Sequence, residues 1–292
     1  MLYSPLRYPG GKGKLAPFME FMIEKLNIQG GTYIEPFAGG AGVALSLLMK
    51  GHVDNIVIND YDKAIYSVWR AILIESNNLI DRIIETPVSI EEWNRQKEIY
   101  TNKNNKYSLD LAFATFFLNR TNRSGILKAG PIGGMEQNGN YLIDARYNRE
   151  NLVNRIKDIA SRKKHIKVYN KEILGFIDCV LPRYGKDVLV YFDPPYFNKG
   201  HELYKNFFKK HDHTIIADRI MNNVDNNWII TYDDTPEIIE IYKNHCIRRF
   251  DLNYSVANTR KSSEVIIFKS TAFCPNNEEL LDKKININLR GV

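Results

Sequence analysis

The residues with the most specific chemistry are Asp193, Pro194, Pro195 and Tyr196, which follow directly on the apolar run 188–192. A short apolar run rich in β-branched residues is typical of a buried strand, so Asp193 is expected at the tip of a strand. Proline fixes its φ angle and has no N–H group. The turn therefore presents only acceptors, the Asp193 carboxylate and the Pro194 carbonyl, beside the flat ring of Tyr196. This arrangement suits an NH₂ group attached to an aromatic ring.

The same arrangement predicts what is done to such an amine. The lone pair of an aromatic amine is delocalised into the ring, which makes the nitrogen a poor nucleophile. Two fixed acceptors draw the nitrogen toward tetrahedral geometry, free the lone pair to attack an activated methyl group, and stabilise the positive charge that develops. A base inside a duplex reaches this pocket only when it is flipped out, and it would then stack on Tyr196. The alternative is a strand-ending turn with structural prolines.

A second motif, YIEPFAGGAGVAL at 33–45, reads as a strand, a glycine-rich turn and a helix. Gly39 and Gly40 allow a ligand to approach the backbone closely. Leu45 stands where a dinucleotide-binding motif has its third glycine, and the turn lacks the lysine of a phosphate-binding loop. Glu35 would repel a pyrophosphate but suits an amine or hydroxyl groups. Asp60 closes the next strand, where a carboxylate can accept from ribose hydroxyls.

S-adenosylmethionine fits this donor set, because it has a ribose, an amino acid head and a sulfonium group but no phosphate. A further glycine-rich element, RYPGGKGKL at 7–15, contains Lys12. Lys12 is either a surface residue of an ordinary loop or a partner for the carboxylate of the cofactor. Taken alone, the glycines at 39–42 also fit a purely structural turn.

The elements that must position these motifs alternate between strands and helices. Strands are predicted at 31–37, 53–60, 187–193 and 227–233, with helices at 41–51, 61–76 and 214–224. Two further strands, at 247–256 and 262–270, flank the polar turn ANTRK. This pattern predicts an α/β fold with a parallel sheet and a hairpin at its end. The polar region from about 90 to 167, with one helical run at 107–120, reads as an insertion.

The positive charge of the chain is concentrated in that insertion. The chain has a net charge of +6, whereas residues 119–171 contain twelve basic and four acidic side chains and therefore carry +8. A basic region on an otherwise nearly neutral protein is typical of a protein that binds a phosphate backbone. The alternative is a solvated helix face.

Several classes of protein are disfavoured by composition. No apolar run is long enough to cross a bilayer, and the amino-terminal segment lacks the apolar core of a signal peptide. The three cysteines are far apart, which indicates neither a disulfide framework nor a zinc site and fits a reducing cytoplasm. His211 and His213 lie close in sequence, but no third ligand accompanies them, so no metal site is expected.

The motifs and their order resemble the DNA adenine N6-methyltransferases of the Dam-like (alpha) group. The motifs that carry the resemblance are RYPGGK at 7–12, EPFAGGAG at 35–42, NDYD at 59–62, DPPY at 193–196 and WIITYDD at 228–234. The resemblance extends from about residue 6 to residue 268. The insertion lies between the cofactor half and DPPY, as in that group.

The resemblance implies a class I S-adenosylmethionine-dependent methyltransferase fold, a Rossmann-like mixed sheet that is parallel apart from a terminal antiparallel hairpin. Residues 1–75 and 166–270 would form the catalytic, cofactor-binding α/β domain. Residues 76–165 would form an inserted, mainly helical DNA target-recognition domain, and residues 271–292 a surface tail.

The resemblance also implies roles for individual residues. The residues implied at the cofactor are Tyr8, Lys12, Glu35, Phe37, Gly39, Gly40, Asp60 and Asp193. The catalytic residues implied are Asp193, Pro194, Pro195 and Tyr196. The residues implied as DNA contacts are Arg120, Asn122, Arg123, Ser124 and Lys128.

The expected function is therefore site-specific transfer of a methyl group from S-adenosylmethionine to N6 of a flipped adenine in double-stranded DNA. The alternatives are an enzyme acting on cytosine N4 or on an RNA adenine, and a catalytically silent DNA-binding protein with this fold. Asp193 favours adenine, because cytosine-N4 enzymes more often carry Ser at that position, and protein-glutamine enzymes usually carry Asn. We expect a monomer or weak dimer, with a restriction endonuclease, if one exists, in a separate chain.

Overall fold

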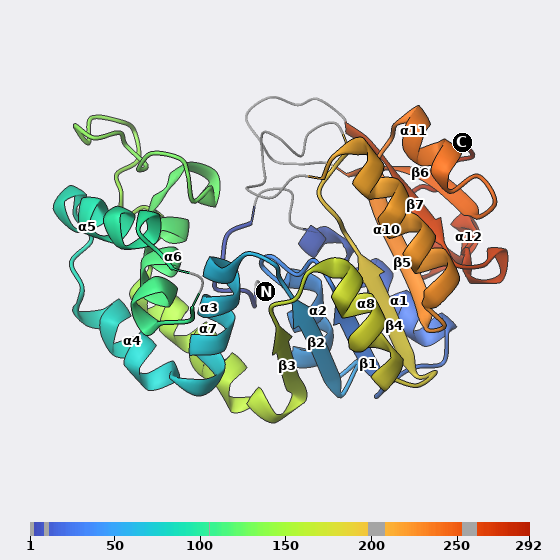
Figure 1. Cartoon of the computed structure of the whole chain (residues 1–292), viewed down its shortest axis with the longest axis horizontal. Helices are drawn as coiled ribbons and strands as arrows, with labels where there is room; N and C mark the ends of the chain where they lie inside the picture. The colour runs from blue at the N-terminus through green and yellow to red at the C-terminus, as the bar shows by residue number, and fades with distance from the viewer. Residues whose placement is uncertain (1–2, 9–11, 105, 198–207, 253–261) are drawn as a thin grey trace.

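The computed structural model describes the chain except for residues 1–2, 9–11, 105, 198–207 and 253–261. These described residues form a seven-stranded sheet in the order β3-β2-β1-β4-β5-β7-β6 (Figure 1). The strands are β1 Thr32–Glu35, β2 Asn55–Asn59, β3 Ile166–Tyr169, β4 Val188–Phe192, β5 Asn227–Asp233, β6 Cys246–Leu252 and β7 Ser262–Phe268.

Strands β1 to β5 pair in parallel, and β7 is antiparallel to both β5 and β6. Parallel strands end at the same edge of a sheet, so the residues that follow β1, β2, β4 and β5 meet at one edge. The expected fold class is confirmed: an α/β fold with a mixed sheet that is parallel apart from a terminal antiparallel hairpin. The expected turn of that hairpin and residues 9–11 of the RYPGGK motif lie outside the described residues.

Helices cover both faces of the sheet (Figure 1). The α-helices are α1 Ala16–Lys25, α2 Gly42–Met49, α3 Lys63–Ile74, α4 Ser76–Glu85, α5 Ile90–Thr101, α6 Leu109–Thr121, α7 Arg149–Ser161, α8 Ile173–Cys179, α10 Lys210–Asn223, α11 Pro236–Ile241 and α12 Asn277–Asp282. Successive strand residues point to opposite faces. Tyr33 therefore packs in the cluster with α1, α2 and α3, and Ile34 packs in the cluster with α8 and α10.

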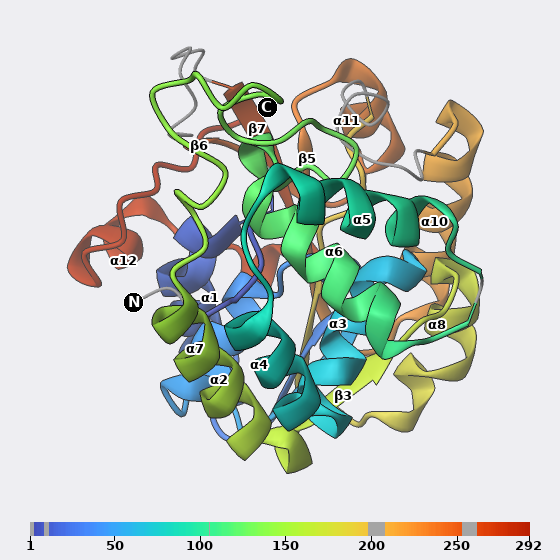
Figure 2. The ribbon, with the colours of Figure 1, turned by 90° about the vertical axis from the view of Figure 1, so that its left-hand side faces the viewer.

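Helices α4 to α7 form a lobe beyond the β3 edge of the sheet (Figures 1 and 2). Helix α6 is buried on nearly all sides, and its Phe113, Phe116 and Phe117 join the same apolar cluster as α2 and α3. The lobe therefore shares a continuous core with the sheet. The sequence predicts α6, but β3, α4 and α5 were not predicted, because their apolar residues are few and separated by polar ones.

The carboxyl-terminal segment differs from the expected surface tail. Leu280 of α12 is fully buried, and Ile285 and Leu289 are also buried. Glu279 accepts a hydrogen bond from Lys25 of α1 at 2.6 Å, and Arg290 donates to Asp251 of β6 at 2.7 Å. Residues 271–292 therefore pack as part of the main body.

No helix among the described residues is long and apolar enough to cross a membrane. The same residues contain no group of three or more His, Cys, Asp or Glu side chains arranged to hold a metal ion. All three cysteines are free thiols.

Candidate active site at the carboxyl edge of the sheet

Asp193 lies at the tip of β4, as the sequence predicts, with its side chain 20% exposed. Thr231 of β5 donates a hydrogen bond to its Oδ1 atom at 2.8 Å. Because the threonine hydroxyl has one proton, it accepts from the Tyr191 hydroxyl at 2.7 Å. Among the described residues, no group binds the other carboxylate oxygen, Oδ2. Within the described part of the chain, Asp193 is therefore bound through Oδ1, which leaves Oδ2 as the oxygen that can accept from a further donor.

The Tyr196 hydroxyl is bound within a buried cluster that links three parts of the chain. Lys12 donates to the Tyr196 hydroxyl and to Glu264 Oε2, the latter at 2.7 Å. Tyr196 in turn donates to Glu264 Oε1 at 2.6 Å. Lys12 Nζ also lies 3.7 Å from Asp193 Oδ1. We call Lys12, Asp193, Tyr196 and Glu264 the DPPY cluster, because it joins this motif to the amino terminus and to β7.

Burial raises the pKa of Asp193 to about 6, against the opposing effect of the Lys12 ammonium. Pro194 is buried and Pro195 half-buried, so the turn is fixed by packing as well as by its two restricted φ angles. The Phe197 amide donates to Asp233 at the end of β5 at 2.8 Å. The tip of β4 is consequently a rigid acceptor that is ionised at neutral pH.

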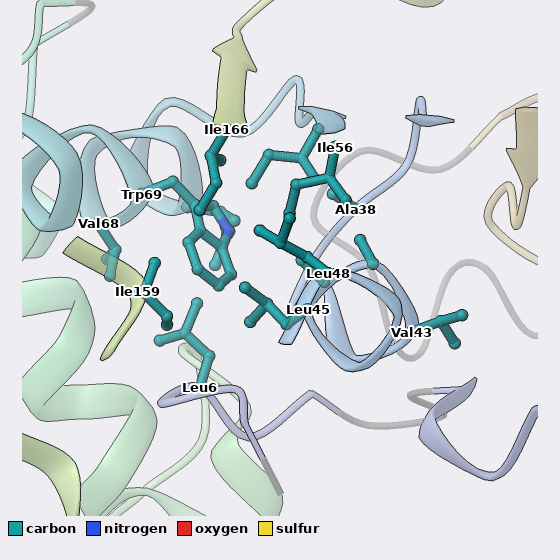
Figure 3. Packing of buried hydrophobic residues seen from close by; sticks show 14 of the residues in the cluster. Leu6, Ala38, Val43, Leu45, Leu48, Ile56, Val68, Trp69, Ile159 and Ile166 are labelled. Carbon is teal, nitrogen blue, oxygen red and sulfur yellow. The ribbon is translucent and has the colours of Figure 1, made fainter. Parts of the chain in front are cut away.

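The glycine-rich turn lies beside β4, between β1 and α2. Gly39 has a φ of +47°, and a Cβ there would lie 2.8 Å from the ring of Tyr8. A Cβ at Gly40 would lie 3.2 Å from Tyr8 Cβ. The Trp69 indole donates to the Gly39 carbonyl at 2.9 Å. Figure 3 shows the Trp69 ring within the apolar packing that includes Leu45, which anchors the turn to the core.

Two carboxylates flank this turn. Glu35 at the end of β1 is buried and accepts from the Ala44 amide of α2 at 3.0 Å, and burial raises its pKa to about 8. Asp60 accepts from the Gly39 amide at 3.0 Å and from the Asp62 amide at 2.8 Å. Burial raises the pKa of Asp60 to about 7. The predicted cofactor residues Tyr8, Glu35, Gly39, Gly40 and Asp60 therefore meet around one turn.

The other predicted cofactor residues lie at its margins. Phe37 is half-buried and packs edge-on against Phe208, with ring centroids 6.0 Å apart. Lys12 is expected at the carboxylate of the cofactor, whereas in the structure its ammonium is bound within the DPPY cluster.

The structure corrects one predicted DNA contact, Asn122. This residue is fully buried, its Oδ1 accepts from the Trp93 indole at 2.6 Å, and its Nδ2 donates to the Ile126 carbonyl at 2.9 Å. Asn122 therefore holds the loop that follows α6. Its neighbours Arg123, Ser124 and Lys128 are exposed on that loop.

Arg120 belongs to a group of four arginines that we call the arginine cluster: Arg7, Arg120, Arg146 and Arg155. Arg120 donates twice to the Arg146 carbonyl, Arg7 donates to the Asn122 carbonyl, and Arg155 donates to the Ser4 carbonyl. None of the four forms an ion pair with a carboxylate within the described part of the chain. Burial first, and then repulsion from the other three arginines, lowers the pKa of Arg120 to about 10.

Sequence reasoning missed several residues that the fold brings to this edge. Thr231 and Trp69 lie inside apolar runs that read simply as a core strand and a core helix. Asn119 is buried and binds the backbone of Arg7 in both directions, which fixes the amino-terminal segment to α6. For Glu264 the sequence does contain an indication of its role, since it is the one acidic residue within the run SSEVIIFKS. An acid in a strand that is otherwise apolar indicates a buried partner.

Comparison with known proteins finds similarity to methyltransferases. A type II methyltransferase of Methanocaldococcus jannaschii, M.MjaIII, is 26% identical over 208 residues, which cover 65% of this chain and 68% of that protein. Two solved structures share weak similarity of overall fold. One, assigned as an RNA methyltransferase of Pyrococcus horikoshii, has a TM-score of 0.40 and 10% identity over 90% of this chain and 83% of its own. The rRNA methyltransferase AviRa of Streptomyces viridochromogenes has a TM-score of 0.36 and 11% identity over 88% and 84%.

The strongest finding is a match to a family model that covers most of the chain. The model for D12 class N6 adenine-specific DNA methyltransferases matches residues 8–257, which contain the glycine-rich turn, the basic insertion and the DPPY motif. The enzyme class expected from the residues, a DNA adenine methyltransferase, is thereby confirmed. The chain belongs to the D12 class N6 adenine-specific DNA methyltransferase family.

Proposed function

We propose that this enzyme transfers a methyl group from S-adenosylmethionine to N6 of an adenine flipped out of double-stranded DNA, within a specific recognition sequence. The observation that carries the proposal is how the Asp193 carboxylate is bound and where it lies. Its Oδ1 accepts from Thr231, no donor to its Oδ2 is found among the described residues, and it stands at the sheet edge beside the glycine-rich turn. An ionised, oriented acceptor at this place is what an exocyclic amine requires.

The residues around the turn fit S-adenosylmethionine. Because residue 39 has no side chain, the ring of Tyr8 lies directly against the turn, which places this ring beside a ligand that binds along the turn. The side-chain oxygens of Glu35 and Asp60 suit an amine and ribose hydroxyls. We infer that Tyr8, Glu35, Phe37, Gly39, Gly40 and Asp60 hold the cofactor, with Lys12 and Asp193 nearby. When bound, the cofactor supplies a methyl group on a positively charged sulfur.

The chain's own residues would act on the amine. Asp193 Oδ2 and the Pro194 carbonyl accept its two N–H groups, which orients the nitrogen lone pair and favours tetrahedral geometry. The same acceptors stabilise the positive charge that develops on nitrogen. Asp193 need not abstract the proton before transfer, because the charged product is far more acidic than the starting amine. Tyr196 is 7% exposed, so stacking of the base on its ring requires neighbouring groups to uncover it.

The order of the motifs favours the Dam-like (alpha) group within the family, with residues 76–165 as the target-recognition domain. Asp193 favours adenine over cytosine N4. Methylation of RNA adenine is the second candidate that the turn itself allows. We propose that the enzyme works in the cytoplasm as a monomer or weak dimer, and that any restriction endonuclease is a separate chain.

Base-resolved sequencing tests this function directly. The chain is expressed in cells that lack adenine methylation, and their DNA and RNA are read for modified bases. We expect N6-methyladenine in DNA at one short recurring sequence. Modification confined to RNA or to cytosine, or binding of S-adenosylmethionine without any modification of DNA, would contradict the proposal.

The arginine cluster and the exposed loop after α6 support DNA as the substrate. Four guanidinium groups without a carboxylate partner among the described residues repel one another, and a bound phosphodiester would offset that repulsion. Arg123 and Lys128 lie on the loop that follows α6, and both are exposed. We infer that Arg120, Arg123, Ser124 and Lys128 contact DNA, and that Arg7, Arg146 and Arg155 add to the positive field.

Salt dependence measures how many charges contact phosphates. In the double variant R123Q/K128Q, the slope of log K for duplex DNA against log salt concentration should fall in magnitude by about 2, since each phosphate contact contributes about 0.9. Fluorescence anisotropy between low and high salt gives this slope.

The matched control is K50Q/K283Q, which removes two lysines that are paired with Glu20 and Glu24 of α1. Its slope should equal that of the wild-type chain. An unchanged slope in R123Q/K128Q would remove this loop from the DNA interface.

A further inference from the structure

Glu264 lies where the antiparallel strand β7 reaches the active edge of the sheet. It is fully buried and pairs in register with Asp233 at the end of β5. Because β7 runs opposite to its neighbours, the beginning of this strand meets the ends of β4 and β5. A residue from the last part of the chain therefore contacts the DPPY motif.

The Glu264 carboxylate makes two different contacts with that motif. Its Oε1 accepts from the Tyr196 hydroxyl at 2.6 Å, and its Oε2 accepts from Lys12 at 2.7 Å. A carboxylate that binds two donors through separate oxygens fixes both donors relative to each other. Lys12 is a full ångström nearer to Glu264 than to Asp193, at 2.7 Å compared with 3.7 Å.

We propose that Glu264 is a positioning residue for methyl transfer: it fixes the ring of Tyr196 and limits how closely the Lys12 ammonium approaches Asp193. The inference rests on the proposed function, because it assigns Asp193 as the acceptor for the amine. Among the described residues, Asp193 is the other carboxylate that pairs with Lys12, at 3.7 Å, so without Glu264 the ammonium would move closer to Asp193. The Lys12 ammonium would then compete with the amine for the acceptor oxygens.

The charge environment of Asp193 makes this role measurable. Lys12 lowers the pKa of Asp193, whereas Glu264 raises it. Among the described residues, the ionisable and hydroxyl groups that interact electrostatically or by hydrogen bonds with Asp193 include Lys12 of the amino-terminal segment, Tyr33 and Glu35 of β1, Tyr191 of β4, Thr231 and Tyr232 of β5, and Glu264 of β7. Neutralising Glu264 leaves the charge of Lys12 to act on Asp193 alone, so the pKa of Asp193 should fall.

The test compares single-turnover methyl transfer to duplex DNA for the wild-type chain and E264Q across pH 5.5 to 9. Glutamine keeps the size of the side chain but not its charge. We expect E264Q to react between about ten- and a hundredfold more slowly at pH 8, as for other residues that orient a reacting group. We also expect the acidic limb of its pH–rate profile, where the rate falls as the pH decreases, to move to lower pH by about one unit. A role in stability alone would not move the limb.

Two further variants separate the parts of the proposal. E264D keeps the charge and should return the acidic limb to the wild-type position. Y196F removes only the hydroxyl, so it should slow transfer without moving the limb. A wild-type rate in Y196F would overturn the positioning of the ring, and an unmoved limb in a folded E264Q would overturn the restraint on Lys12.

The matched control is D234N, which breaks the 2.8 Å ion pair with Arg249 on the same part of the sheet but does not touch the DPPY cluster. It should leave both the rate and the acidic limb unchanged. If the wild-type chain transfers no methyl group to adenine, the proposed function fails. If the wild-type chain transfers it and E264Q behaves identically, only the role of Glu264 fails.

Discussion

D193N should reduce the rate of methyl transfer at pH 8 by about a hundred- to a thousandfold, the loss that follows removal of one preorganised partner of a developing charge. Asparagine has nearly the same size as aspartate and can still accept from Thr231. It lacks the negative charge that stabilises the developing cation, and its NH₂ group can face the amine. Single-turnover assays with labelled cofactor and duplex DNA measure the loss.

The pH dependence of the wild-type chain gives an independent check on the same group. Only ionised Asp193 accepts two donors freely, and burial raises its pKa to about 6. Activity should therefore fall as pH decreases through about 6, and D193N should have no such limb. T231V removes the 2.8 Å hydrogen bond to Oδ1 but keeps the charge of Asp193. Its rate of methyl transfer should lie between those of the wild-type chain and D193N. Wild-type turnover in a folded D193N would exclude Asp193 from the reaction.

K12M should lower the free energy of unfolding by about 3–5 kcal/mol, because it removes the cationic partner of a fully buried carboxylate. Lys12 and Glu264 have side chains that are 3% and 0% exposed and lie 2.7 Å apart. The double variant K12M/E264M replaces both charges by apolar groups and should recover most of this loss. Urea unfolding at pH 8, followed by circular dichroism, measures both variants.

K25M is the control for an exposed ion pair. Lys25 and Glu279 lie 2.6 Å apart, but both side chains are partly exposed, so their loss should cost at most about 1 kcal/mol. If K12M destabilises the chain no more than K25M does, the buried pair contributes little to stability. If K12M/E264M is no more stable than K12M, the loss comes from packing and not from the unpaired charge.

The motifs that the sequence predicts are those whose chemistry is contained in a short stretch of chain. DPPY predicts its own rigid turn, since two prolines fix two φ angles wherever the segment lies. The glycines of the turn at 35–42 predict that a ligand can approach the backbone closely; in the structure the ring of Tyr8 lies against Gly39. The hairpin of β6 and β7 was also predicted, because its two apolar runs are neighbours in the chain.

Asn122 shows where prediction from local sequence fails. It lies between Arg120 and Arg123 in a basic stretch, and nothing in that stretch distinguishes a residue that faces a ligand from one that faces the core. Its position is decided by Trp93, which lies 29 positions away in the chain. The Trp93 indole donates a hydrogen bond to the Asn122 side chain and holds it in the interior. Burial depends on which helices pack together, and α5 was not predicted at all.

By itself, the sequence determined the class of fold, the methyltransferase motifs and the acceptor at the end of β4, because these depend on periodicity and on residue chemistry over short spans. The tertiary structure alone decided which side chains complete the site. Lys12 and Glu264 are 252 positions apart, and they meet because β7 enters the sheet antiparallel to β5 and brings its first residues to the edge where the parallel strands end. Strand pairing over such a distance is fixed by the burial of the whole sheet, which no local pattern records.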